Sequence, residues 1–115
     1  MEISVMYGKV KFLNDFIEYL KNTDINDWCE KVYRTVDNKN CLFGHLVEYF
    51  EKSNYEDENI APIIDTFENQ FASTYMVFPV NDGTSELYKQ DNPRDRCIAY
   101  FTDMMNGKVS TTWET

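Results

Sequence analysis

The segment from Trp28 to Phe50, WCEKVYRTVDNKNCLFGHLVEYF, organises the expected fold. It holds one of the two tryptophans, two of the three cysteines and the single histidine. Its first part, up to Val36, is rich in strand-favouring residues whose spacing fits neither secondary-structure period, and it predicts an extended segment. The polar run 37–40 predicts a turn. The apolar run that follows predicts a helix over 41–52, which we expect to be the central and most buried one.

Two residues at the start of this helix carry specific expectations. Asn40 can cap it, because a side-chain oxygen at that position accepts one of the unpaired backbone N–H groups. Gly44 lowers helix propensity by about 1 kcal/mol relative to Ala, so we expect another backbone to approach closely there. The packing residues of the helix are expected to be Leu42, Leu46 and Phe50.

Helices are predicted on both sides of this segment. A helix over 9–22 is indicated by an apolar stripe at helical period, formed by Leu13, Phe16, Ile17 and Leu20. A helix over 59–72 is indicated by Pro62 in its first turn and by a stripe made of Ile60, Ile63, Ile64, Phe67 and Phe71.

The last helix, over 93–106, has the best-defined ends. Asn92 can cap it, Pro93 suits the first helical position, and Gly107 suits the position just past the end. Its predicted apolar stripe consists of Cys97, Ile98, Phe101 and Met105.

The remaining stretches are less regular. Residues 73–91 predict a short extended run at Tyr75, Val77 and Pro79, followed by a turn at 81–83, where the sequence reads Asn-Asp-Gly. Residues 1–7 alternate and predict a short strand or a disordered lead-in, and 109–115 read as a β-type tail.

These elements predict a mainly α protein, a compact single domain over 1–115 with about four helices and a minor β element between the first two. The core is expected over about 9–107, with a C-terminal tail at 108–115. A chain of 115 residues has material for one core. Its eight Phe, eight Tyr and two Trp can fill that core, since each aromatic side chain buries about 150–250 Å².

The formal net charge of −9 argues against nucleic acid or an anionic membrane as a direct ligand, and it permits a basic protein partner. No apolar run approaches the roughly 18 residues that span a bilayer. The N-terminal residues MEISVMYGKV lack the pattern of a signal peptide. Three cysteines without paired spacing suit a reducing cytosol, so a cytoplasmic protein is expected.

Two catalytic or metal arrangements can be written from the residue types. Four possible zinc ligands are present, namely Cys29, Cys41, His45 and Cys97, but no two cysteines form the close pair typical of zinc sites. A thiol nucleophile could combine Cys29, His45 and Asp82. We expect neither: the cysteines are predicted to be reduced, buried and metal-free, and His45 to bond a backbone carbonyl. No catalytic residue, metal or cofactor is predicted.

Three short motifs follow one another along the chain: Trp28-Cys29-Glu30, the run 40–46 reading NCLFGHL, and Asn81-Asp82 before a closing amphipathic helix. This order resembles a small bacterial and phage domain family of uncharacterised function, over about residues 10–107. The run 78–80, Phe-Pro-Val, departs from the family, where a tryptophan is common. The resemblance implies no catalytic residue. It implies a structural motif that comprises Trp28, Cys29, Cys41, Gly44, His45, Asn81 and Asp82, with the 81–82 side chains expected to bond backbone groups near Trp28.

The function expected from these observations is that of a non-enzymatic acidic interaction protein. The resemblance implies a phage setting, and the expected role is an inhibitor of a host defence system, of the anti-CRISPR kind, that occupies a basic nucleic-acid-binding surface in the host cytosol. The carboxylates expected to bind are Glu48, Glu51, Glu56, Asp57 and Glu58, with Tyr49 and Tyr55 as anchors. The alternatives are a small-molecule or nucleotide-binding module and a Cys/His thiol or zinc enzyme.

Overall fold

The computed structural model of the chain describes residues 6–52, 67–69, 71, 72 and 74–109, and the side chains of 10–50, 67–69, 71, 72 and 75–109. The elements are α1 (Met6–Lys21), the 3₁₀ helix η1 (Ile25–Asp27), α2 (Leu42–Lys52), α4 (Thr74–Asp82) and α5 (Pro93–Met105). The predicted mainly α fold is confirmed.

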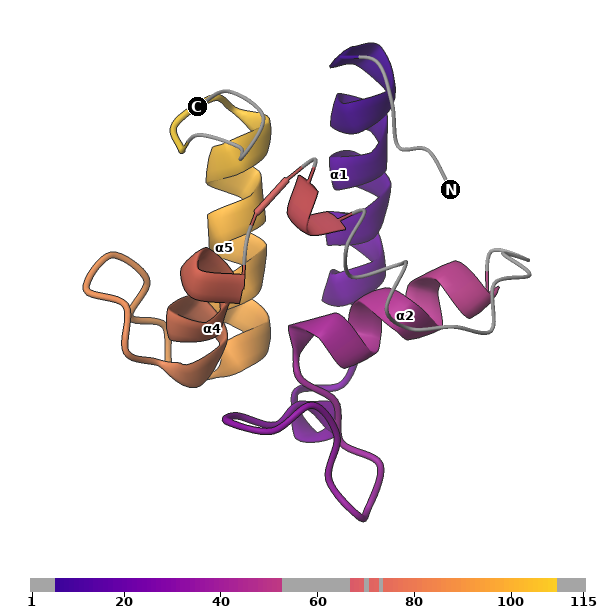
Figure 1. Cartoon of the computed structure of the whole chain (residues 1–115), viewed down its shortest axis with the longest axis vertical. Helices are drawn as coiled ribbons and strands as arrows, with labels where there is room; N and C mark the ends of the chain where they lie inside the picture. The colour runs from indigo at the N-terminus through magenta and orange to yellow at the C-terminus, as the bar shows by residue number, and fades with distance from the viewer. Residues whose placement is uncertain (1–5, 53–66, 70, 73, 110–115) are drawn as a thin grey trace.

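Helices α1 and α5 lie side by side and make the most extensive helix–helix contact among the described elements (Figure 1). Helix α4 packs on α5, and α2 crosses one end of α1 while it also contacts α5 (Figure 1). The segment between η1 and α2 loops out beyond that end of the molecule. The core between the helices is strongly aromatic, with Phe16, Phe67, Phe71 and Phe101 fully buried. None of the described helices is both long enough and apolar enough to cross a membrane.

Helix α1 confirms its predicted apolar stripe, because Leu13, Phe16, Ile17 and Leu20 are all buried. The helix begins at Met6, however, so the alternation at residues 6 and 7 does not form a strand. A two-residue alternation is compatible with either period, and here the helix extends through it. Residues 1–5 lie outside the described part of the chain.

Helix α5 follows its local signals closely. The Asn92 side chain accepts a hydrogen bond from the backbone N–H of Asp95 at 2.9 Å, Pro93 opens the helix, and Gly107 has a φ of +76° just past the end. Its buried face is turned slightly from the predicted stripe: Ile98 and Met105 are only partly buried, and the buried residues are Arg96, Cys97, Tyr100, Phe101 and Met104. The burial of an arginine is the largest departure from the predicted stripe.

Helix α2 is heavily buried over its first half, and Leu42, Leu46 and Phe50 are buried as predicted. Helix α2 contacts α1 and α5, and its start also meets α4, since Phe43 lies edge to face with Phe78 and Leu42 bonds to Asn81. Helix α2 therefore contacts each of the other described α-helices, as expected of a central helix, and α5 shares this position because it contacts α1, α2 and α4.

Helix α4 corrects the prediction for residues 73–83. The run through Tyr75, Val77 and Pro79, predicted to be extended, is helical, and Asn81 and Asp82 form its last turn. Only Gly83, with a φ of +81°, retains the turn conformation. Burial of Val77 and Val80 against α5 stabilises the helix and outweighs the weak local propensity.

The β structure described for the segment from Trp28 to Cys41 consists of two isolated β-bridges, Trp28 with Asn40 and Arg34 with Asn40. These bridges are the whole of the predicted minor β element in the described residues. The turn predicted at 37–40 begins one residue earlier: Val36 and Asp37 form it, the N–H of Asn38 bonds to the carbonyl of Thr35 at 3.0 Å, and Asn38 has a φ of +64°. An extended segment with few ladder bonds depends on side-chain contacts for its position.

The predicted helix over 59–72 falls mostly outside the described residues. Residues 67–69 are helical, and Phe67 and Phe71 are fully buried. Within the tail predicted to be of β type, residues 110–115 also lie outside the described part.

Candidate functional site

Asn81 joins three parts of the chain. Its side-chain oxygen accepts a hydrogen bond from the backbone N–H of Leu42 at 2.9 Å, and its amide nitrogen donates to the carbonyl of Cys29 at 3.0 Å. Since Asn81 is only 1% exposed, these bonds form away from water. A residue on α4 therefore satisfies the start of α2, and the expected contact of residue 81 with backbone groups beside Trp28 is present.

Asp82 fixes the adjacent loop. Its Oδ1 accepts hydrogen bonds from the backbone N–H of Lys31 at 2.8 Å and from the side-chain amide of Asn81 at 3.0 Å. Lys31 has a φ of +71°, which is unusual for a residue with a side chain. The Asp82 carboxylate thus holds the loop at the point where its backbone turns left-handed.

Arg96 binds from α5 to the junction, by which we mean the place where the 29–31 segment, the start of α2 and the end of α4 meet. Its guanidinium donates to the carbonyls of Val80 and Asn81, both at 2.8 Å, and to the carbonyl of Gln90 at 2.9 Å. It also forms an ion pair with Glu30. Because the last carbonyls of a helix have no partner inside it, Arg96 satisfies the end of α4 from α5. Arg96 is 5% exposed and was not predicted as a structural residue.

The start of α2 differs from the prediction. Asn40 does not cap the helix: its side-chain oxygen accepts from Nε of Arg34 at 2.6 Å, and its amide donates to Glu48 at 3.0 Å. Asn81 takes part of this role, since its side-chain oxygen accepts the backbone N–H of Leu42, the first residue of the helix. A distant residue with a better-placed oxygen has replaced the local cap.

Gly44 is required for a reason other than the one predicted. A Cβ atom at this position would lie 2.6 Å from the side-chain oxygen of Asn40. The close approach is therefore that of the Asn40 side chain and not of a second backbone. Glycine at 44 lets this side chain lie flat against the first turn of α2.

All three cysteines are buried and none forms a disulfide. Burial raises the pKa of each thiol, most strongly at Cys97, and the neighbouring Cys41 adds to the rise at Cys29. A reactive cysteine needs a lowered pKa, so the environment of these thiols favours the neutral, unreactive form.

The alternative of a thiol nucleophile that combines Cys29, His45 and Asp82, which the sequence does not favour, gains no support from the geometry. The Cys29 thiol lies 3.3 Å from the carbonyl of Val32 and 3.4 Å from that of Lys39, while Asp82 is bound to backbone and amide groups. Nε2 of His45 lies 3.2 Å from the carbonyl of Asp27, as expected for a histidine bonded to backbone, and its ring packs on Trp28 at 4.2 Å. Each group meets the backbone rather than a catalytic partner.

The four possible zinc ligands do not come together as a metal site. Within the part of the chain that the structure describes, no group of three or more His, Cys, Asp and Glu side chains is arranged to hold a metal ion.

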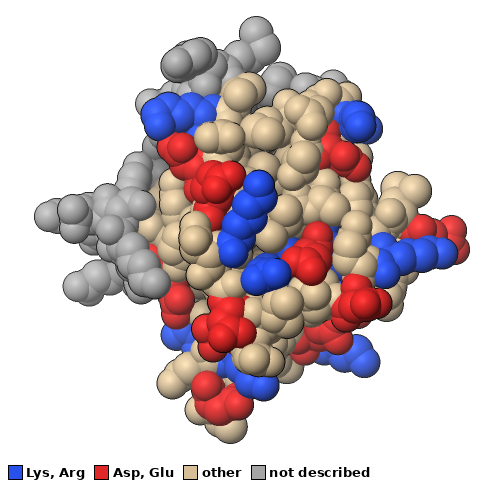
Figure 2. Space-filling view, turned by 180° about the vertical axis from the view of Figure 1, so that it is seen from behind, with Lys and Arg blue, Asp and Glu red and all other residues tan. Residues whose placement is uncertain are grey.

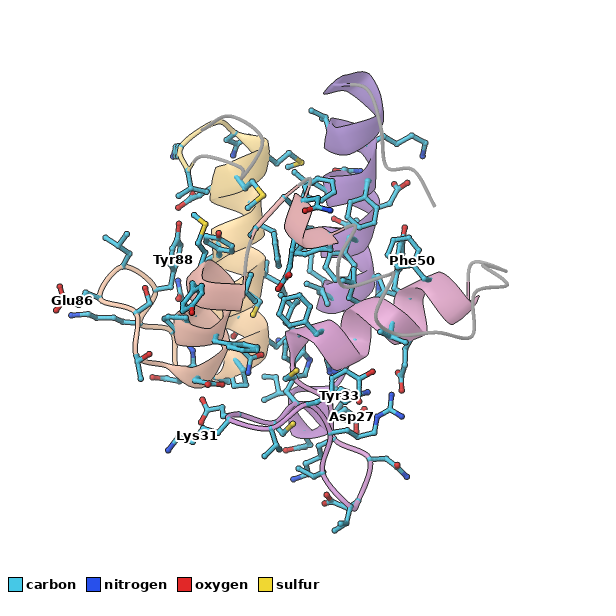
Figure 3. All side chains as sticks on the ribbon, viewed as in Figure 1. Asp27, Lys31, Tyr33, Phe50, Glu86 and Tyr88 are labelled. Atoms are coloured by element: carbon cyan, nitrogen blue, oxygen red, sulfur yellow. The ribbon has the colours of Figure 1, made fainter. Side chains whose placement is uncertain are left out.

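An apolar pocket of about 290 Å³ opens beside the junction. Its walls are mainly apolar and come from the 31–33 loop, from α2 and from α4. The apolar lining residues are Val32, Tyr33, Phe43 and Phe78. Asp82 and Cys41 add polar groups. Figure 3 shows Lys31 and Tyr33 on the loop, beyond the ends of α4 and α2 that face it. The hydrogen bonds of Asn81 and Asp82 therefore set the shape of this pocket.

Exposed apolar side chains continue outward from the pocket. Val32 and Phe78 line it and are 52% and 47% exposed, and Tyr75 lies one helical turn before Phe78 and is 90% exposed. We refer to Val32, Tyr75 and Phe78 as the apolar face. Neighbouring exposed apolar side chains of this kind mark interaction surfaces more often than isolated ones do.

The predicted acidic binding patch is only partly described. Glu48 is half-buried, bonded to Asn40 and 3.6 Å from the guanidinium of Arg34, so it serves the fold. Tyr49 packs against Phe12, Phe16, Tyr19 and Phe50, and its burial raises its pKa. Tyr49 is therefore partly buried and packs against the core, and its role as an anchor stays a prediction. The side chain of Glu51 and the whole of Tyr55, Glu56, Asp57 and Glu58 lie outside the described residues.

Sequence reasoning missed the apolar pocket and Arg96. Tyr75 and Phe78 were assigned to an extended run, in which three-residue spacing does not bring side chains together. On a helix the same spacing makes them neighbours. Arg96 carried one available signal, a cation flanked by the apolar residues of a predicted buried stripe.

Comparisons with protein-family models, with curated proteins and with solved structures found no match to this chain. The resemblance to the small bacterial and phage family stays a prediction from the motifs around Trp28, Cys41 and Asn81.

Proposed function

We propose that the protein is a non-enzymatic interaction protein that binds a basic protein and blocks its nucleic-acid-binding surface. In the setting that the motif resemblance implies, the target is a host defence protein and the chain is a phage-encoded inhibitor of the anti-CRISPR kind. The apolar face is the observation that carries the proposal. Val32 and Phe78 line a pocket and are exposed, and the exposed Tyr75 lies one helical turn before Phe78. Aromatic residues beside a pocket are common energetic anchors of protein interfaces.

The charge of the chain supports a basic target. The formal net charge is −9, and carboxylates on a binding surface steer a basic partner and suppress wrong ones. On the face shown in Figure 2, Lys and Arg side chains are interspersed with the acids. The side chains that the structure does not describe include seven acids and two lysines, so they carry more than half of the excess. The steering role therefore falls mainly on 51–65, where five of these acids lie.

The proposal is tested by capture and competition together. The full chain is expected to capture a basic protein from host lysate in equal stoichiometry and to displace nucleic acid from it. Replacing Glu56, Asp57 and Glu58 with Lys is expected to abolish this binding and to flatten the salt dependence of its association rate, because long-range attraction is screened by salt. Unchanged binding by the triple variant would reduce the acids to a solubility role. Capture without loss of nucleic-acid binding would contradict the proposed inhibition.

A small-molecule-binding module is the second candidate, because the apolar pocket is close to the lower end of the roughly 300–1,000 Å³ range of ligand sites. A ligand that raises the melting temperature at micromolar concentration in the absence of any protein partner would favour this function.

A further inference from the structure

We infer that the apolar pocket is an anchor site for one large apolar side chain, presented by a basic segment of a protein partner. This rests on the proposed function and specifies how the partner is held. The inference follows from three properties of the site: what lies around its mouth, how its walls are fixed, and which charges face it.

The surroundings of the pocket favour a peptide segment over a free small molecule. A small ligand would fill the pocket and cover only the inward sides of Val32 and Phe78, and it would leave their outward sides exposed together with Tyr75, one helical turn before Phe78. A segment whose side chain enters the pocket would also cover these three residues with its backbone and neighbouring side chains. It would therefore bury the exposed apolar area that the pocket alone leaves in water.

The walls of the pocket are held in place before any partner binds. Phe43 and Phe78 meet edge to face with ring centroids 5.8 Å apart, and the loop on the opposite side is fixed through the bond from Lys31 to Asp82. Aromatic walls favour an aromatic guest, because rings gain from edge-to-face contact. A pocket that is already formed also loses little conformational entropy on binding.

The charges favour a basic flank. Both hydrogen bonds recorded for the Asp82 carboxylate go to Oδ1, so Oδ2 has no recorded partner among the described residues and is the acceptor left for an incoming donor. The one cation at the mouth, Lys31, is exposed and forms no ion pair recorded among the described residues, so its ammonium can turn away into water. With a net charge of −9 on the whole chain, a cationic residue next to the anchor is favoured over an anionic one.

The test uses the full chain and the capped peptide acetyl-Gly-Phe-Arg-Lys-Gly-amide, followed by amide chemical shifts. The expected result is a saturable shift at Val32, Phe43 and Phe78. A peptide with Gly in place of Phe is expected to bind at least about tenfold more weakly, since burying a large apolar side chain contributes about 1.5–3 kcal/mol. A peptide with Glu-Glu in place of Arg-Lys is also expected to bind more weakly.

Matched variants separate the pocket from general charge. Val32→Lys is expected to weaken binding of the Phe peptide at least about tenfold. Val36→Lys makes the same charge change on an exposed residue outside the pocket and is expected to leave this binding unchanged. Asp82→Asn keeps the Oδ1 acceptor and is expected to weaken binding about two- to fivefold, as for an exposed ion pair. Thermal melts of each variant establish that the fold is intact.

The inference is overturned if the Gly peptide binds as tightly as the Phe peptide, if no shifts appear near the pocket, or if Val36→Lys weakens binding as much as Val32→Lys. Its failure can be told apart from failure of the proposed function. A captured target that binds Val32→Lys as tightly as the unchanged chain contradicts the anchor site alone. A chain that captures no basic protein contradicts the function, whatever the peptide shows.

Discussion

Helices α4 and α5 lie against each other, yet they form for different reasons. Helix α5 has its own start and stop signals, with Asn92 as the cap and Gly107 just past the end. Helix α4 is nine residues long, contains Pro79 and ends on carbonyls that Arg96 satisfies from α5. One helix is specified within its own sequence, and the other depends on its neighbour. The apolar pocket lies beside the dependent helix.

The largest effect on stability is expected from Arg96→Ala, which removes the support that α4 receives from α5. Arg96→Ala removes the donors to the carbonyls of Val80, Asn81 and Gln90, and losing one partner of a buried charged network costs about 3–5 kcal/mol. Urea denaturation measures this loss. Amide hydrogen exchange is expected to accelerate in α4 much more than in α5.

Arg94→Ala is the matched control, because Arg94 is an arginine on the same helix whose bonds within the described part of the chain go to Asp95 and to the carbonyl of Thr23. It is expected to cost about 1 kcal/mol, the usual net value of a hydrogen bond. If the two variants were equally stable, α4 would not depend on Arg96.

Asn81→Ala is expected to have the next largest effect. It leaves the N–H of Leu42 and the carbonyl of Cys29 buried without partners, at about 1–3 kcal/mol each, so a loss of at least about 2 kcal/mol is expected. Asn106→Ala, at an exposed position after α5, is the control and is expected to change stability little. A melting temperature unaffected by Asn81→Ala, combined with loss of partner binding, would assign Asn81 to the interface instead.

Tyr88 links the α4–α5 loop to α5, because its hydroxyl donates to Asp103 at 2.9 Å. Burial, with the neighbouring Asp103, raises the pKa of Tyr88 from 10 to about 12. A raised folded-state pKa gives stability that is complete below pH 10 and is lost as the pH rises through about 12. Tyr88→Phe is expected to cost about 1–2 kcal/mol at neutral pH and to make the alkaline loss shallower.

The alkaline measurement has a built-in comparison. Burial also raises the pKa of Tyr100 to about 12, so part of the loss between pH 10 and 12 is expected to persist in Tyr88→Phe. Denaturation curves at pH 8 give the stability cost of Tyr88→Phe, and curves at pH 11 give the alkaline loss that remains in this variant. A pH dependence identical to that of the unchanged chain would show that folding does not raise the pKa of Tyr88, and an unchanged stability at pH 8 would show that the bond to Asp103 adds nothing.

The smallest effect is expected at the self-contained helix. Asn92→Ala removes the cap of α5, at about 0.5–2 kcal/mol. Most of α5 should remain helical, since Cys97 and Phe101 are fully buried in the core. A loss larger than that of Arg96→Ala would reverse the comparison and make α5 the more fragile helix.

Local sequence determined several features of this protein. The stripe from Leu13 to Leu20, the apolar run after Cys41 and the signals at Asn92 and Gly107 each act within one helix, and each predicted its helix correctly. The mainly α class follows from these, because burial at helical period is readable from residues three and four apart.

Tertiary structure alone decided the pocket and its supports. Asn40 could cap α2 by its position, but Asn81 supplies an oxygen to that helix from 39 residues away, and the Asn40 side chain bonds Arg34 and Glu48 instead. The residues 75–82 form a helix because a neighbouring helix buries one side of them and Arg96 closes their end. A local pattern offers possible partners for a polar group, and the packed chain selects the one that is nearest in space, because a buried group left without a partner costs about 1–3 kcal/mol.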